Sequence, residues 1–504
     1  MTLALAAVYA LFSTVSDGYY QHDEIAHFLG MRQFWHDPSS ALGNWAKPGY
    51  KILYAPFALL GRHAVTILNA LVAAGSAFAA TKAAERMGVR QPLVAFALLA
   101  LQPLWLGLAF RSYAELPTAL LLTLAVWAHA ATRPGWAALA LSYAVTIRQE
   151  LAPVVLLYAV WLAWTRRWTL VPLLGVFPLL VNLWGWAATG DPLHLLHEAV
   201  GTGANIADAY PRQGLWHYPS TLLVIFGGVA VAWVVAYAAQ IRRRGEGESP
   251  AWHPFVVVPL VLYTAAHIAF QIQSVPMGPA TGGNLRYLTV VAPLVSILGA
   301  IAADRWRRDD WGRLAVAMGA LTVVALLFWA HADNGIALLP ERSLAPVVGV
   351  LLGVGTVLAR VPMRTRLGLI VAATVVTALV VVRPKAQTPE EATAMEAARW
   401  LADADGGLDA RPILVSHPVV NLANDRAAGD YAKGSKAVTG AHIRAAAPGT
   451  RIVWDSHYSY RPNLRADDLD YQTLYADTAH FRLVREPFVS ADQTFGIFVF
   501  DKIR

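Results

Sequence analysis

The sequence predicts an all-α polytopic membrane protein with about 13 transmembrane helices, followed by a C-terminal α/β domain. The first observation is composition. The 504 residues are 56% hydrophobic and 14% charged, whereas a soluble domain carries about 25% charged residues. The second is order along the chain, because apolar runs alternate with polar segments until about residue 382 and a mixed composition follows. We therefore expect a transmembrane domain at 1–382 and a soluble extracytoplasmic domain at 383–504.

The apolar runs define the expected transmembrane helices. They lie near residues 2–16, 54–81, 92–110, 116–131, 136–147, 151–165, 169–189, 219–240, 254–272, 287–303, 314–331, 344–360 and 367–382. A helix needs about 20 apolar residues to cross a bilayer. The fourth to sixth runs are shorter than this, so we expect those helices to extend into their polar flanks. The first run lacks a basic n-region and an Ala-x-Ala exit, which indicates a retained span rather than a cleaved signal.

Basic residues orient the expected spans. They gather in every second loop, at Lys82, Arg86, Arg90, Arg133, Arg166, Arg167, Arg242–Arg244, Arg305, Arg307, Arg308, Arg313, Arg360, Arg364 and Arg366. The positive-inside rule makes these loops cytoplasmic. The long loops 17–53, 190–218 and 273–286 then face outward, as does the C-terminal domain.

The same distribution bears on partners and cofactors. The net charge of +7 lies in short clusters between apolar runs, so it predicts membrane orientation and no nucleic-acid partner. The chain contains no cysteine. Disulfides, iron–sulfur clusters and thiolate metal sites are therefore excluded.

The C-terminal segment carries signals of both helix and strand. Thr388-Pro-Glu-Glu391 is a capping box with proline at the first helical position, and it predicts a helix to about Asp403. Short runs rich in β-branched and aromatic residues follow at 412–415, 451–454, 481–484 and 495–500. This alternation predicts a small α/β fold.

The first long loop, residues 17–53, is the expected seat of chemistry, because long ordered loops tend to carry function. Asp23 and Glu24 stand just outside the first span. Ile25, Phe28, Leu29 and Trp35 recur at helical spacing, which favours a helix lying in the membrane interface. A carboxylate held there could act as a general base on an acceptor hydroxyl. The alternative is that the acids only stabilise the start of this helix.

Lys47 and Tyr50 lie in Lys-Pro-Gly-Tyr at the entrance to the second span. A lysine at headgroup depth can neutralise a phosphate, although a lysine at a span end also commonly extends to the interface for solvation alone.

Three further sites lie on the expected outer side. Their residues are Arg111 with Glu115, Arg148 with Glu150, and Arg286 with Tyr287. Outer arginines oppose the positive-inside bias, and a guanidinium suits phosphate geometry. Local pairing of Arg111 with Glu115 and of Arg148 with Glu150 is the alternative. Arg286 has no acid nearby in sequence, so a binding role is favoured for it.

The histidines give weaker evidence for a functional site than the charged residues do. Asp23 and His27 have the i, i+4 spacing that a helical metal site would need, but no HExxH-like motif is present. A metal site is therefore not predicted, while a divalent ion as a cofactor stays open. His457 is not accompanied by a GxSxG-type nucleophile, so a catalytic triad is not predicted either.

Together these residues resemble the GT-C membrane glycosyltransferases. The pattern is an Asp-Glu pair after the first span, an interfacial helix, Lys-Pro at the second span and an outer Arg-Tyr before a late span. The protein O-mannosyltransferases and lipid A aminoarabinose transferases are the most similar groups. Their KPPLY-like motif is matched in part by Lys47-Pro48-Gly49-Tyr50, which lacks the second proline. His22-Asp23-Glu24 is also similar to a motif of mannosyltransferases that extend lipid-linked glycans. The sequence contains no WWDYG motif, which argues against an oligosaccharyltransferase.

The resemblance implies inverting transfer of a single sugar from a polyprenyl-phosphate carrier to a lipid, glycan or protein acceptor. Asp23 would be the base or substrate-orienting carboxylate, with Glu24 and Asp37 as substitutes, and Glu115 would assist. Lys47 and Arg286 would hold the lipid phosphate, and Arg148 is a further candidate for that role. The protein would lie in a bacterial or archaeal plasma membrane, with its site on the outer face.

A transporter or lipid flippase is the alternative from another class. Transporters carry ionisable residues near mid-span and show paired repeats. Here the notable charges lie at span ends on one face and no repeat is visible, which favours the enzyme. A structural assembly protein would account for the C-terminal domain but not for the first loop.

Overall fold

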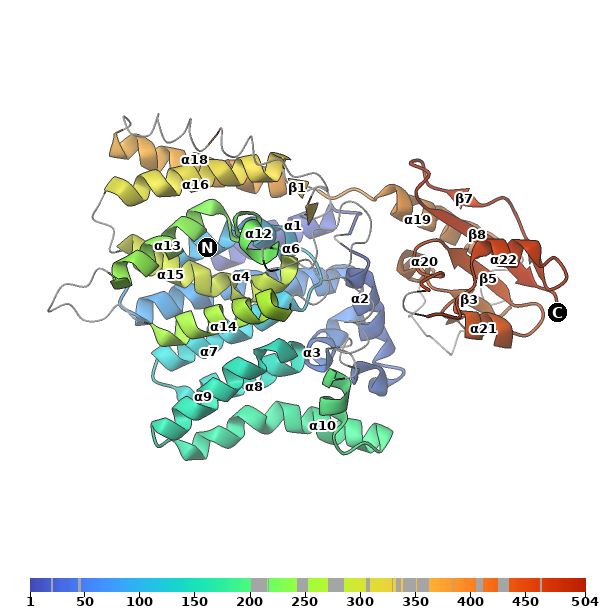
Figure 1. The fold of residues 1–504 in the computed structure, drawn as a ribbon, viewed down its shortest axis with the longest axis horizontal. Helices are drawn as coiled ribbons and strands as arrows, with labels where there is room; N and C mark the ends of the chain where they lie inside the picture. The colour runs from blue at the N-terminus through green and yellow to red at the C-terminus, as the bar shows by residue number, and fades with distance from the viewer. Residues whose placement is uncertain are drawn as a thin grey trace. The chain divides into compact units, whose positions relative to one another are not determined.

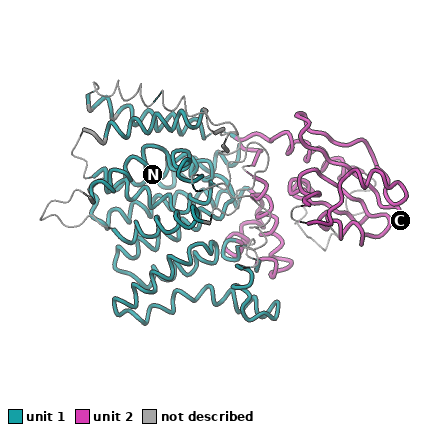
Figure 2. Tube along the Cα trace, viewed as in Figure 1, with its two compact units in different colours: residues 1–15, 42–50, 63–384 teal, residues 16–41, 51–62, 385–504 magenta. Residues whose placement is uncertain are grey.

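The computed structural model divides the chain into two compact units, each described separately below (Figures 1 and 2). Unit 1 contains residues 1–15, 42–50 and 63–384, and unit 2 contains residues 16–41, 51–62 and 385–504. The structure describes residues 1–19, 21–43, 47–200, 215, 217–242, 253–270, 285–304, 309–328, 330–331, 337–338, 350, 362–382, 384–404, 411–424, 435–462 and 465–504. Most of the first loop thus groups with the C-terminal segment, a division that sequence order alone does not reveal.

Unit 1 is built mainly of helices. They are α1 (Thr2–Thr14), α4 (Arg62–Arg86), α5 (Leu93–Ala100), α6 (Pro103–Ala109), α7 (Glu115–Ala130), α8 (Pro134–Ile147), η2 (Gln149–Leu151), α9 (Ala152–Trp164), η3 (Trp168–Gly175), α10 (Val176–Thr189), α12 (His217–Phe226), α13 (Gly228–Arg242), α14 (Pro254–Phe270), η4 (Leu285–Val291), α15 (Ala292–Asp304), α16 (Asp309–Phe328) and α18 (Met363–Val381). A short pair of strands, β1 (Ala330–His331) and β2 (Ala337–Leu338), completes the described part. Helix α3 (Pro48–Ala58) is shared between the units.

Each predicted apolar run coincides with one or two of these helices, except 344–360, which lies outside the described residues apart from residue 350. Four helices in the described part are long and apolar enough to cross a membrane, or up to five if the bent pair α12 and α13 is one span. Several shorter apolar helices accompany them. The mostly helical architecture is therefore observed, while the number of 13 spans and their orientation stay predictions.

Three apolar runs are each divided into two helices, at a glycine with positive φ or at a proline. Gly61 and Gly227 have φ of +99° and +79° and separate α3 from α4 and α12 from α13. Glycine adopts this left-handed region without the steric penalty of a Cβ. The helices α12 and α13 meet at 114°. Pro103 begins α6 and so divides the run 92–110, because proline tolerates the first helical position but not the interior of a helix.

Small residues allow the helices of unit 1 to approach closely, and α13, α15, α16 and α18 lie in neighbouring layers (Figure 1). A Cβ added to Gly228 of α13 would collide with the carbonyl oxygen of Met318 in α16. Helix α4 buries a series of alanines, including Ala70, Ala73 and Ala77. Interfaces of this kind are typical of helices that associate in a membrane through backbone packing.

Unit 2 contains a six-stranded sheet with strand order β4-β3-β5-β8-β6, and β7 also pairs with β8. The strands are β3 (Ile413–Val415), β4 (Ser435–Lys436), β5 (Arg451–Asp455), β6 (Phe481–Leu483), β7 (Phe488–Val489) and β8 (Gly496–Lys502). Strand β3 runs parallel to β4 and β5, with Ile413 opposite Arg451, and the pairs made by β8 are antiparallel. The predicted strand runs at 412–415, 451–454, 481–484 and 495–500 are all present.

Helices cover both faces of this sheet. The helices of unit 2 are α2 (Asp23–Gln33), η1 (Pro38–Ala41), α19 (Pro389–Asp403), α20 (Pro418–Ala423), α21 (Gly440–Ala445) and α22 (Tyr471–Ala476). Leu414, Ile452 and Phe500 pack with Ile443 of α21 and Leu474 of α22. On the opposite face, the guanidinium of Arg451 lies 5.6 Å from the ring of Trp400 in α19. The central strand β5 is buried throughout because side chains alternate between two covered faces.

The capping box at the start of α19 forms as predicted. The Thr388 hydroxyl accepts from the Glu391 amide at 3.2 Å, and a Glu391 carboxylate oxygen accepts from the Thr388 amide at 2.8 Å. The other Glu391 oxygen accepts from the Tyr19 amide at 3.3 Å. This helix terminus therefore also ties the first loop to the C-terminal segment within unit 2.

We expect Thr388→Ala to destabilise unit 2 by about 1 kcal/mol, because it removes the acceptor of the N-cap. Hydrogen exchange of the α19 amides in the full-length protein measures this effect. Thr478→Ala, an exposed threonine substitution in the same unit, is the matched control. Equal protection of α19 in both variants would contradict the stabilising role of the cap.

Candidate functional site

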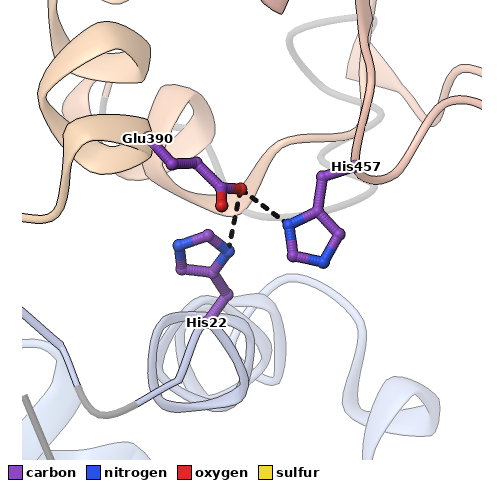
Figure 3. A group of neighbouring side chains, drawn as sticks. All are labelled: His22, Glu390 and His457. Atoms are coloured by element: carbon purple, nitrogen blue, oxygen red, sulfur yellow. Dashed lines mark hydrogen bonds and ion pairs between the residues drawn. The ribbon is translucent and has the colours of Figure 1, made fainter. Parts of the chain in front are cut away.

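Two polar clusters stand out, one in each unit. In unit 1, Glu115, Arg148, Glu150, Arg286 and Tyr287 come together, and we name them the arginine–glutamate cluster. In unit 2, His22, Glu390, His417 and His457 come together, and we name them the histidine–glutamate cluster. Figure 3 shows three of them, His22, Glu390 and His457.

Helix ends place the residues of the arginine–glutamate cluster. Glu115 is the first residue of α7, Arg148 follows the last residue of α8, and Glu150 lies in η2. Arg286 and Tyr287 belong to η4, at the start of the run that continues as α15. Each residue stands where an apolar run meets a polar turn, so helix packing brings turns that are distant in sequence to one place.

Glu115 is the centre of the ion pairs in this cluster. Its Oε1 contacts the Arg148 guanidinium and lies 3.2 Å from Nε of Arg286. Nη1 of Arg148 also donates to Oε1 of Glu150 at 3.1 Å. The side chains of Glu115, Arg148 and Arg286 are 1%, 3% and 4% exposed, while that of Glu150 is 40% exposed. The local pairing expected as an alternative is observed for Arg148 with Glu150, but Arg148 also pairs with Glu115, and Arg286 has gained an acid from another helix.

Aromatic rings enclose the two guanidinium groups. Arg148 lies 4.4 Å from the ring centre of Tyr287, and Arg286 lies 4.8 Å from that of Tyr113. Such cation–π contacts strengthen when water is excluded. These contacts hold the guanidinium planes in fixed orientations. The side chain of an isolated arginine on the surface has no such constraint.

Helix α14 adds two neighbours that the sequence analysis missed. The rings of Tyr263 and His267 lie 4.3 Å apart, and His267 lies 5.7 Å from the Tyr287 ring. His267 is buried, with Nδ1 2.9 Å from the Tyr263 carbonyl oxygen. A polar residue near the end of an apolar run is a signal of function in membrane helices. His267 could have been selected on that ground.

Lys47, Tyr50 and Arg111 lie in unit 1 beside this cluster. The Tyr50 hydroxyl is 2.8 Å from that of Ser112, and the Arg111 guanidinium lies 5.0 Å from the Phe110 ring. The charge of Lys47 acts on both Glu115 and Glu150. The predicted binding residues of unit 1 thus carry four cations, Lys47, Arg111, Arg148 and Arg286, against two carboxylates, which gives an environment suited to an anion.

Lys47 has a φ of +54° and precedes a proline. A non-glycine residue in this left-handed region is strained, and proline further disfavours a helical conformation before it. Strain of this kind costs about 1–3 kcal/mol and tends to occur at functional sites. The backbone therefore singles out Lys47 independently of its charge.

Asp23 and Glu24 lie in unit 2, at the start of α2. Asp23 is half-buried and Glu24 is 1% exposed. The predicted helix is present over Asp23–Gln33, so Trp35 follows it, and α2 packs against α20. Whether α2 lies in a membrane interface stays a prediction. Asp37 accepts from the amide and hydroxyl of Ser39, which makes it a local cap of η1.

The histidine–glutamate cluster brings together residues from the first loop, from α19 and from the turns that follow β3 and β5. Oε1 of Glu390 lies 3.7 Å from Nδ1 of His22 and 2.6 Å from Nδ1 of His457 (Figure 3). The same oxygen lies 3.1 Å from Nε2 of His417. Burial, with the nearby His417, lowers the pKa of His22 to about 3. Burial raises the pKa of Glu390, but hydrogen bonds from His417 and His457 outweigh it and the net pKa lies well below its ordinary value.

Lys51 is a second buried cation near the first loop. Its Nζ donates to the Ser40 carbonyl oxygen at 3.1 Å, and the residue is 4% exposed. Nζ also lies where a Cβ on Gly30 of α2 would be, at 2.7 Å. Burial lowers the pKa of Lys51 to about 8.

Comparison with solved structures shows the fold. ArnT from Cupriavidus metallidurans bound to undecaprenyl phosphate is similar at a TM-score of 0.57 and 14% identity, over 99% of this chain and 97% of the ArnT chain. Its apo state gives a TM-score of 0.56 at the same identity and coverage. An Archaeoglobus fulgidus oligosaccharyltransferase tethered to an acceptor peptide gives 0.44 and 11%, over 98% and 74% of the two chains. No family profile and no curated protein sequence matches this chain.

The expectation of a mostly helical fold similar to that of GT-C proteins is thereby confirmed. The chain has the overall fold of the solved ArnT structures, which belong to the GT-C superfamily. Within that fold, it is similar to ArnT, an aminoarabinose transferase, along nearly its whole length.

We expect Glu115→Gln to destabilise unit 1 by about 3–5 kcal/mol, because it removes the shared counter-charge of two buried guanidinium groups. Thermal unfolding of the purified protein in detergent measures the loss. Glu150→Gln is the matched control, since that carboxylate is 40% exposed and an exposed pair contributes at most about 1 kcal/mol. Equal melting temperatures for the two variants would contradict the central position of Glu115.

We expect the burial of Lys51 to make unit 2 more stable as the pH rises above about 8. The folded state then releases a proton that the unfolded state, with its pKa near 10.5, still binds. Stability increases with pH wherever the unfolded state binds more protons, and the full effect is roughly 3 kcal/mol.

Melting temperatures of wild type and Lys51→Met at a pH of about 7.5 and about 10 test this linkage. The melting temperature of the wild type should rise relative to that of Lys51→Met at the higher pH. Lys436→Met, at an exposed lysine of the same unit, should follow the wild type at both values. Parallel behaviour of wild type and Lys51→Met would show that Lys51 is not desolvated.

Proposed function

We propose that this chain is a membrane glycosyltransferase that moves one sugar from a polyprenyl-phosphate carrier to a lipid, glycan or protein acceptor, with inversion at the sugar carbon. The reaction takes place on the outer face of the membrane, where the positive-inside rule puts the first loop and the C-terminal segment. The single observation that carries this proposal is the buried arginine–glutamate cluster at the helix ends of a chain with the GT-C fold.

The chemistry of the cluster suits the lipid phosphate. Arg148 and Arg286 share Glu115, which fixes both guanidinium groups in a site where water is largely excluded. Guanidinium groups match phosphate oxygens in bidentate geometry. Lys47 adds a further charge to this environment. The solved ArnT structure that this chain resembles holds undecaprenyl phosphate, a ligand of the same chemical class.

Glu115 acts as a positioning residue in this proposal. A carboxylate that contacts two arginines is a weak base, because both cations favour its ionised form. Its contribution is to orient the groups that neutralise charge on the leaving phosphate. Preorganised cations of this kind stabilise a transition state more than flexible ones, since they need no reorganisation as charge develops.

Asp23 is the proposed general base. The carboxylate takes the proton of the acceptor hydroxyl, and the acceptor oxygen attacks the anomeric carbon from the face opposite the phosphate. The bond between that carbon and the phosphate oxygen breaks, and polyprenyl phosphate leaves with its electron pair. Arg286, Lys47 and Arg148 neutralise the leaving phosphate, while the proton stays on Asp23 until release.

Sugar transfer by the purified protein in lipid, over a panel of polyprenyl-phosphate sugars, tests the function. Wild type should consume one donor, and Asp23→Asn should lower the turnover by about 100-fold or more, the scale of a lost general base. Asp477→Asn, which changes an exposed carboxylate paired with His480, should retain activity. Melting temperatures establish that each variant is folded.

The outcome also separates the enzyme from its alternative. An intact donor across the panel, together with movement of a lipid or solute across the membrane that Asp23→Asn leaves unchanged, would establish a transporter or flippase. Activity in Asp23→Asn but not in Asp37→Asn would move the base to Asp37.

Lys47→Gly separates the charge of Lys47 from its backbone strain. Glycine adopts a φ of +54° readily. The relieved strain of about 1–3 kcal/mol is partly offset by the larger entropy that glycine loses on folding, so the variant should melt at or above the wild-type temperature. Its transfer activity should nevertheless fall by at least about 10-fold, because the amine that helps to neutralise the phosphate is gone. Lys47→Arg should retain part of the activity. Full activity in Lys47→Gly would remove Lys47 from the site.

A further inference from the structure

We propose that His22, Glu390 and His457, all in unit 2, form a binding site for a divalent transition metal ion. Zn²⁺ is the ion that suits the site best. This site shares no residue with the arginine–glutamate cluster, and its existence does not depend on the proposed transfer reaction.

The ligand atoms converge across large separations in sequence. One nitrogen of each histidine and one carboxylate oxygen of Glu390 lie within 4.8 Å of one another. Figure 3 shows both imidazole rings turned toward the Glu390 carboxylate. His22 precedes α2, Glu390 is in the first turn of α19, and His457 is in the turn that follows β5. Three elements of unit 2 thus direct ligating atoms to one point.

The two separations that involve Glu390 fit a metal after small movements. Bonds of about 2.0–2.1 Å in tetrahedral geometry put neighbouring ligand atoms roughly 3.3 Å apart. The distance from Nδ1 of His22 to Oε1 of Glu390 is 3.7 Å, and that from Nδ1 of His457 to the same oxygen is 2.6 Å. The second pair is a hydrogen bond, and a metal ion would replace its proton and open it by less than about 1 Å.

His417 completes the site as an orienting residue. Its Nδ1 accepts from the Val419 amide at 3.3 Å, so the proton of the neutral ring sits on Nε2, which donates to Oε1 of Glu390 at 3.1 Å. His417 is fully buried. Ligating groups are usually held by such second hydrogen bonds, and loss of one typically weakens metal affinity by about 10–100-fold.

The composition of the site favours zinc with one open position. Two imidazoles and one carboxylate are a zinc ligand set that leaves the fourth place to water or to another ligand. Imidazole nitrogens argue against Mg²⁺ and Ca²⁺, which prefer oxygen ligands. The side chains of Glu390 and His457 are 25% and 23% exposed, so water can reach the fourth place.

Without metal, the same residues form a hydrogen-bonded network. Nδ1 of His457 donates to Glu390, and Nδ1 of His22 forms a hydrogen bond of 2.8 Å with the Tyr458 hydroxyl. A metal ion would replace both hydrogen bonds, and the ring proton of His457 would pass to Nε2. Because His22 immediately precedes Asp23, an ion here also fixes the start of α2 relative to α19 inside unit 2.

Metal content of the full-length protein, purified through a tag that contains no histidine, tests the proposal. Protein stripped with a chelator should bind one Zn²⁺ per chain, and Co²⁺ should give the visible absorption of a tetrahedral site. His22→Asn, Glu390→Gln and His457→Asn should each weaken binding by at least about 100-fold, and His417→Asn by about 10–100-fold. His480→Asn is the matched control, because His480 pairs with Asp477 in the same unit but is exposed.

Melting temperatures with and without Zn²⁺ guard against a variant that fails to fold. Wild type and His480→Asn should melt higher with zinc, since a ligand that binds only the folded state stabilises it, while folded His457→Asn should not respond. Zinc binding that is equal in wild type and in the double variant His22→Asn/His457→Asn would overturn the site. So would wild-type protein that binds neither ion, which would leave the network as a purely hydrogen-bonded connection.

Discussion

The contact between Glu115 and the guanidinium groups of Arg148 and Arg286 is the constraint on which unit 1 depends. A buried charge is tolerated only when it is paired and hydrogen-bonded, because desolvation of a lone ion is far more costly than one interaction can offset. These three side chains are almost fully buried. The ends of α7, α8 and η4 must therefore stay together, and the packing of small residues elsewhere in the helices allows it. A cluster held this firmly is preorganised for an anion, which is the property that transfer from a lipid phosphate requires.

Unit 2 also holds a cluster of buried polar side chains in fixed positions. Its sheet is covered on both faces, so the turns after β3 and β5 and the first turn of α19 have fixed positions. Those positions carry His417, His457 and Glu390, and the first loop supplies His22. The result is a polar centre in which each group has a defined partner. Such networks hold a unique arrangement only when they are fully satisfied, and a metal ion is one way to satisfy this one.

Much of the helical architecture follows from local pattern. Apolar runs predicted the helices of unit 1, and Thr388 to Glu391 predicted the start of α19 together with its capping hydrogen bonds. The breaks at Gly61 and Gly227 were not predicted, since glycine within an apolar run is common in membrane helices and becomes a break only where packing demands a positive φ. The grouping of the first loop with the C-terminal segment was also beyond prediction, because it depends on contacts between residues far apart in sequence.

For the candidate sites, the sequence by itself determined which residue types stand at the ends of apolar runs. Charges there are unusual, which is why Glu115, Arg148 and Arg286 could be selected without a structure. Only the tertiary structure decided their partners: Arg286, which has no acid nearby in sequence, meets Glu115 across two helix ends. The same holds for Glu390 and His457, which are 67 residues apart and meet His22 from the first loop. The physical reason is that charge and hydropathy are properties of single residues, whereas a pair or a ligand set exists only when the packing of several elements brings its members within bonding distance.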